Sequence, residues 1–148
     1  MKTKTLMLFA FLLVAHSSVE AAQQASLVPE GWREVAVPQS KAKLFISPDG
    51  TARLRAGHES AHPANLAAEM NAMAYHEGET VTYQRRGKSW LAVSGYRGGE
   101  IYYRKANLAC GGTRWHIVEL RYPREAKKRL DDIVTTAARR MTAYNRDC

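Results

Sequence analysis

The stretch that decides the fold runs from Thr80 to Tyr122 and reads TVTYQRRGKSWLAVSGYRGGEIYYRKANLACGGTRWHIVELRY. Within it apolar and polar residues alternate, which is the period of a β-strand. Segments rich in glycine interrupt the alternation, and such segments join antiparallel strands in hairpins. The stretch therefore predicts four consecutive antiparallel strands. They cover residues 80–84, 89–96, 100–108 and 114–122.

The residues before this stretch predict three more strands and a helix. Short runs with strand character occupy 32–37, 42–47 and 52–55, and the turn sequence Ser47-Pro48-Asp49-Gly50 joins the last two. A polar loop is expected over residues 57–62. Pro63 then suits the first turn of a helix, whose apolar face has helical spacing and which Gly78 would end. The apolar residues of that face are Leu66, Met70, Met73 and Ala74.

The residues after the stretch predict a terminal helix. Pro123 ends the last strand, and an apolar stripe at helical spacing follows. In the preceding strand, the side with Val118 and Leu120 is expected to face the core, because Glu119 makes the other side mixed. The sequence thus predicts an α+β fold, with an antiparallel sheet of about six to seven strands flanked by two helices. The stripe comprises Ala126, Leu130, Ile133, Val134, Ala137 and Met141.

The N-terminus has the order of a secretory signal peptide. Lys2 and Lys4 precede an uninterrupted apolar run over residues 6–15, and small residues before Ala22 predict cleavage after Ala21. The run is too short to anchor the chain in a bilayer as a helix. We therefore expect a signal peptide at 1–21, a single exported domain at 22–148, and a periplasmic or secreted location.

Two cysteines, Cys110 and Cys148, are present in the 148-residue chain. In an oxidising compartment an even pair predicts a disulfide. A dimer linked through Cys148 is the alternative. A thiol nucleophile built from Cys110, His116 and Glu119 is disfavoured because Cys148 is a candidate disulfide partner for Cys110 and no oxyanion-type motif lies nearby.

The net charge of +8 predicts solubility or an anionic partner. Outside the cytosol, nucleic acid is not expected, and a polyanion of the cell envelope or an acidic protein would be the partner. Aromatic side chains interleave with the cations of the sheet, either as a binding surface or as core beneath the helices. The candidate binding residues are Arg85, Arg86, Lys88, Arg97, Arg104 and Lys105.

Three histidines are weak candidates for a metal site. His58 and His62 have a spacing of four, but Gly57 and Pro63 place them in a loop, and His76 is expected about 20 Å further along the helix. One compact site is hard to build from them, so solvated surface histidines are the expected outcome and no metal or other cofactor is predicted. His116 is expected to be a packed histidine of the core.

Several segments together resemble small exported bacterial domains of the PsbP-like class. They are SPDG (47–50), VTY (81–83), SWLAVSG (89–95), YYRK (102–105) and RYP (121–123), in a region of similarity over residues 32–144. The resemblance implies an α-β-α sandwich, and accessory or binding roles rather than enzymatic ones. These are turn and core residues, so the resemblance transfers no binding residue.

The sequence therefore predicts a periplasmic or secreted accessory protein without a catalytic site, which binds an anionic envelope component or a protein. Two alternatives remain. The first is a metal-handling or hydrolytic envelope protein that uses His58, His62 and His76. The second is an inhibitor of an acidic partner protein.

Overall fold

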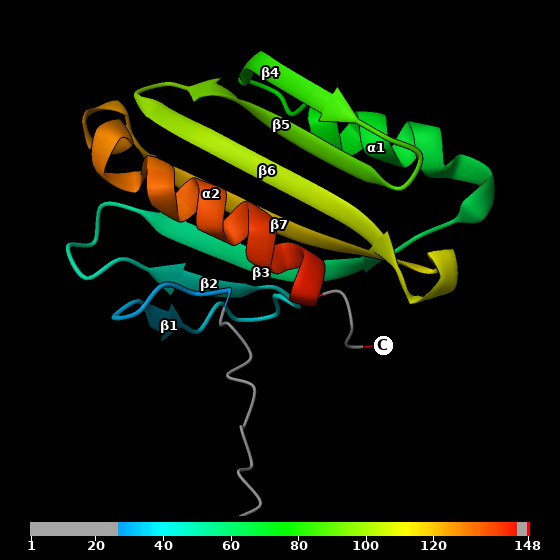
Figure 1. The fold of residues 1–148 in the computed structure, drawn as a ribbon, viewed down its shortest axis with the longest axis horizontal. Helices are drawn as coiled ribbons and strands as arrows, with labels where there is room; N and C mark the ends of the chain where they lie inside the picture. The colour runs from blue at the N-terminus through cyan, green and yellow to red at the C-terminus, as the bar shows by residue number, and fades with distance from the viewer. Residues whose placement is uncertain (1–26, 145–147) are drawn as a thin grey trace, which may run out of the picture.

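The computed structural model describes residues 27–144 and residue 148. These residues form a seven-stranded antiparallel sheet with one α-helix on each face (Figure 1), so the predicted α+β class and helix-sheet-helix layering are confirmed. The predicted signal peptide and its cleavage site lie outside the described residues. None of the described helices combines the length and apolarity needed to cross a membrane.

The strands follow the order β1-β2-β3-β7-β6-β5-β4, so β1 and β4 are the two edges. The four predicted strands of the central stretch become β4 to β7, and β7 pairs with β3 to join them to the N-terminal strands. The bounds are β1 Arg33–Val35, β2 Lys43–Ile46, β3 Arg53–Ser60, β4 Thr80–Arg86, β5 Trp90–Arg97, β6 Glu100–Ala109 and β7 Arg114–Pro123.

Strand β3 is longer than the sequence predicted. Residues 57–60 were expected to be a polar loop, yet they pair with residues 114–117 of β7. The long β7 offers a free row of backbone donors and acceptors, and pairing with it outweighs the weak strand propensity of Gly57-His58-Glu59-Ser60. This correction places His58 in a strand.

Helix α1 spans Leu66–Ala74 and follows a single 3-10 turn at Pro63–Asn65. Its buried residues Met70, Met73 and Ala74 pack with Leu91, Ala106 and Trp115 of the sheet. The helix ends four residues before Gly78, which instead forms a turn with a φ of 78°. The side of β7 that the sequence predicted to be mixed is therefore core as well, because Trp115 is only 1 % exposed beneath α1.

Helix α2 spans Lys127–Tyr144, after a 3-10 turn at Arg124–Ala126, and covers the opposite face. Leu130 and Ala137 pack on Leu54, Val118 and Leu120, so the predicted core-facing side of β7 is confirmed.

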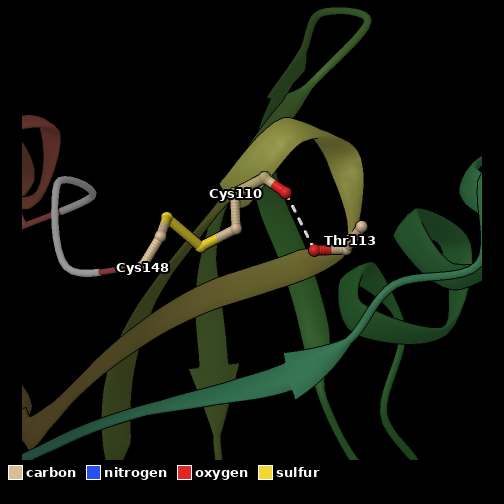
Figure 2. The surroundings of a disulfide bond; sticks show 3 residues. All are labelled: Cys110, Thr113 and Cys148. Atoms are coloured by element: carbon tan, nitrogen blue, oxygen red, sulfur yellow. Dashed lines mark hydrogen bonds between the residues drawn. A yellow bond between two sulfur atoms is a disulfide. The ribbon is translucent and has the colours of Figure 1, made fainter.

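The predicted disulfide joins Cys110 to Cys148 within one chain (Figure 2), with 5.4 Å between the Cα atoms. Cys110 lies in the 3-10 turn Cys110–Gly112 that connects β6 and β7, and its carbonyl oxygen accepts a hydrogen bond from the Thr113 hydroxyl at 2.8 Å. The structure thus contains the intrachain pairing rather than the dimer considered as its alternative. The bond attaches the end of the chain to the β6–β7 hairpin.

Candidate functional site

A cavity of about 470 Å³ lies between α1 and the part of the sheet formed by β3 and β7. Alternation directs Trp115, Ile117 and Glu119 of β7 to the α1 side, and Met73 of α1 closes the cavity opposite them. The segment at Ala42 forms another wall. A Cβ atom on Gly57 would lie 2.8 Å from the Ala42 Cβ, so this close approach depends on glycine.

A largely buried network of four charged side chains adjoins one end of the cavity, which Arg104 and Glu119 line. Arg104 donates to Glu79 through Nη1 at 3.2 Å and through Nη2 at 2.8 Å, and its Nε donates to Glu119 at 2.7 Å. Arg121 donates to Glu79 at 3.0 Å and to Glu119 at 2.6 Å. The charges of the two arginines and the two carboxylates cancel. Because each charge is paired, Arg104 can be buried, with only 2 % of its surface exposed.

A backbone carbonyl beside the network completes the hydrogen bonds of Arg104. Arg104 Nη1 also donates to the Met73 carbonyl at the last turn of α1, at 2.8 Å. Burial alone would raise the pKa of Glu119, but the hydrogen bond from Arg121 and the charge of Arg104 outweigh burial, so the pKa is lowered. The Glu119 carboxylate therefore stays ionised, and the hydrogen bond from Arg104 to the Met73 carbonyl fixes α1 to the sheet.

Glu69 occupies the other end of the cavity with both carboxylate oxygens engaged. One oxygen accepts from the Trp115 indole at 2.7 Å, and the other accepts from the His62 backbone N–H at 3.0 Å and lies 2.8 Å from His62 Nδ1. The hydrogen bond from Trp115, followed by that from His62, lowers the pKa of Glu69. This carboxylate orients the ring that forms the cavity floor.

The three candidate histidines all line this cavity, closer together than the sequence suggested. They do not converge on a point. His58 pairs in register with His116, so alternation directs its side chain to the face opposite Gly57 and Glu59. Burial, followed by the charge of Arg104, lowers the pKa of His76.

Within residues 27–140 and residue 148, the one set of three potential metal ligands close enough to share an ion is His76, Glu79 and Glu119, within 4.8 Å. Arg104 and Arg121 already hold both carboxylates. A cation entering there would lie beside two guanidinium groups. These residues therefore do not fit a resident metal ion.

Two cations of the cavity have no hydrogen-bond or ion-pair partner among the residues that the structure describes. Arg55 lies on β3 opposite Glu119 in register, and Lys41 precedes the wall at Ala42. The Glu119 carboxylate is held by Arg104 and Arg121 and leaves Arg55 unpaired. Both cations line the cavity and are exposed to an incoming ligand.

The six candidate anion-binding residues separate into two groups. Arg104 is buried in the network, and Lys105 donates to the Ala138 carbonyl of α2 at 2.9 Å, so neither forms part of an open basic surface as the sequence suggested. Arg85, Arg86, Lys88 and Arg97 are exposed on or beside β4 and β5. His116 is 3 % exposed on the α2 face, and Cys110 is disulfide-bonded, which excludes the thiol nucleophile.

Sequence reasoning missed Glu69, Glu79 and Arg55. Comparison with known proteins assigns the chain to no family, because no family model and no curated protein matches it. The resemblance to the PsbP-like class stays a prediction, and the functional argument depends on the geometry of the cavity.

Proposed function

We propose that this chain is a non-catalytic, exported binding protein whose cavity between α1 and β3–β7 holds a small organic anion. The single observation that carries the proposal is Arg55. Its guanidinium lines the cavity, while the nearest carboxylate in register, that of Glu119, is held by two other arginines. A carboxylate or phosphate is the group that a guanidinium without a partner binds best.

The remainder of the cavity favours a ligand with an apolar body. Met73, Trp115 and Ile117 line it next to the charged end. Its volume of about 470 Å³ is in the range of small-molecule sites, which combine apolar walls with a few placed polar groups. A free inorganic anion would leave these apolar walls uncovered, so the ligand is better matched by an aromatic or aliphatic acid.

Binding is favoured over catalysis by how the buried charges are used. Arg104, Glu79 and Glu119 engage one another, and Glu69 is held by Trp115 and His62. Groups held in this way stabilise the walls of the cavity and are poorly placed to exchange protons with a ligand.

Export is part of the same proposal. It is supported by the signal-like N-terminus and by the Cys110–Cys148 disulfide, a bond typical of oxidising compartments. Intact-mass measurement of protein isolated from its native cells tests it: the chain should begin at Ala22, and a chain that begins at Met1 would contradict export.

Ligand-induced thermal shift tests the binding proposal. Benzoate, octanoate and phenyl phosphate should raise the melting temperature, and benzamide, octanamide and phenol should not. Arg55→Gln should remove the effect of the acids. Arg53→Gln is the matched control, because Arg53 lies two residues away on the same face of β3 but is bound to Glu100 and does not line the cavity.

A second variant tests the location. Ala72 is an exposed residue of α1 that lines the cavity, so Ala72→Leu should reduce binding without removing charge. The proposal fails if acids and their neutral analogues act alike, or if Arg55→Gln and Arg53→Gln respond equally.

A further inference from the structure

The free edge of β4 is a second feature, separate from the cavity. Among the described residues, β4 pairs with β5 only and forms one edge of the sheet. A register shift between Val81 and Tyr83 leaves an extra residue there, and such bulges hinder pairing. The half of β4 beyond the bulge, residues 83–86, keeps regular strand geometry and unpaired backbone groups on its outer side.

Exposed aromatic side chains flank this half of β4 on both faces. Tyr83 is 47 % exposed on the α2 face. On the same face Ser94 of β5 lies between it and Tyr103 of β6, because Ser94 pairs in register with both residues. Tyr75 is 60 % exposed on the α1 face, and its hydroxyl donates to Gln84 at 2.9 Å. Trp90, 38 % exposed, lies on the neighbouring strand. Tyrosine and tryptophan are the side chains most enriched at the energetic centres of protein interfaces.

The charge of the edge has one sign. Residues 80–97, which comprise β4, β5 and their turn, contain four cations and no carboxylate. Arg85 lies on the α2 face beside Ala92, and Arg86 lies on the α1 face, where it donates to Asn71. A strand added to this edge would place two successive side chains opposite these two arginines, one on each face.

We propose that the edge of β4 at residues 83–86 pairs with an extended acidic segment of another protein. Backbone hydrogen bonds would supply affinity, and carboxylates opposite Arg85 and Arg86 would supply selectivity. A second copy of this chain fits less well, because it would bring the same cations to the edge, and like charges on neighbouring strands destabilise pairing. This inference does not depend on the ligand of the cavity.

The test uses a labelled ten-residue peptide in which two adjacent glutamates are flanked by alternating valine and threonine. It should bind the full chain in fluorescence anisotropy, bind more weakly as salt increases, and protect amides of residues 83–86 from hydrogen exchange. Arg85→Glu with Arg86→Glu should weaken binding at least tenfold. Arg33→Glu on β1, the opposite edge, is the control for a single charge reversal such as Arg85→Glu, and it should leave binding unchanged.

Four outcomes would overturn the inference. They are equal binding of a peptide with lysine in place of glutamate, binding without protection of residues 83–86, equal effects of the β4 and β1 variants, and a dimer whose β4 amides are protected in the absence of peptide. The melting temperature of each variant shows whether it folds, and the exposed positions of Arg85 and Arg86 lead us to expect that it does.

Discussion

Replacing Glu79 with glutamine should be among the most destabilising conservative changes in this protein. The Glu79 side chain is fully buried. One oxygen accepts from Arg104 at 2.8 Å and from Arg121 at 3.0 Å, and the other accepts from Arg104 at 3.2 Å. Glutamine has the same shape, but its amide nitrogen is a donor and would face a guanidinium donor. The substitution therefore removes a charge and at least one hydrogen bond.

The expected loss in the free energy of unfolding follows from the partners that Arg104 retains in the variant. The network changes from electroneutral to a net charge of +1, with Arg104 only 2 % exposed. Removing one partner of a buried ion pair costs about 3–5 kcal/mol. Arg104 keeps Glu119 and the Met73 carbonyl, so we expect the lower end, about 3 kcal/mol. That is a large part of the total stability of a typical domain, about 5–15 kcal/mol.

Urea unfolding of Glu79→Gln, Arg104→Met and the double variant measures the effect. In the Arg104→Met background, Glu79→Gln should lower the free energy of unfolding by at least about 1 kcal/mol less than it does in the wild type. The reason is that Arg104 is then no longer present as a buried cation without its partner. Glu100→Gln is the control. Glu100 forms a partly exposed ion pair with Arg53, and its loss should cost under about 1 kcal/mol. Additive single effects, or a Glu79→Gln variant as stable as the control, would refute the reasoning.

Two further variants test the remaining structural conclusions. Cys148→Ser should lower the free energy of unfolding by up to about 4 kcal/mol, the entropy of closing a loop across 38 residues, and the difference from wild type should vanish in reductant. Burial, followed by the charge of Arg104, lowers the pKa of His76, so the unfolded chain binds its proton more tightly. Wild-type stability should therefore fall as the pH drops through about 6.5, and His76→Gln should flatten this dependence of the urea midpoint.

Strand alternation predicted the fold well because it is a local signal. The run from Thr80 to Tyr122 contains its own turns, and each of its four strands is present. The end of β3 was missed because Gly57 to Ser60 carry no strand signal of their own and become a strand only by pairing with β7. The disulfide was predictable because the chain has only two cysteines.

The site was less predictable, since its contacts join distant segments. Arg104 and Glu119 were both identified, but only the β6–β7 register places them opposite each other on the α1 face. That register was readable in principle from the short turn between the strands, and it would have indicated a buried ion pair rather than a basic surface. Glu79 reaches the network from a loop, and no local pattern indicates that.

The position of the cavity follows from the unequal lengths of the two helices. At 1.5 Å per residue, the 18 residues of α2 extend about 27 Å and the nine residues of α1 about 14 Å. Helix α1 makes most of its sheet contacts with β5 and reaches β7 at Trp115, so β3 lacks a helical cover on this face. The β3 side chains on this face are open to solvent, and the exposed Arg55 lies among them. The charged network fixes the end of the short helix, and the space that the helix does not cover becomes the cavity.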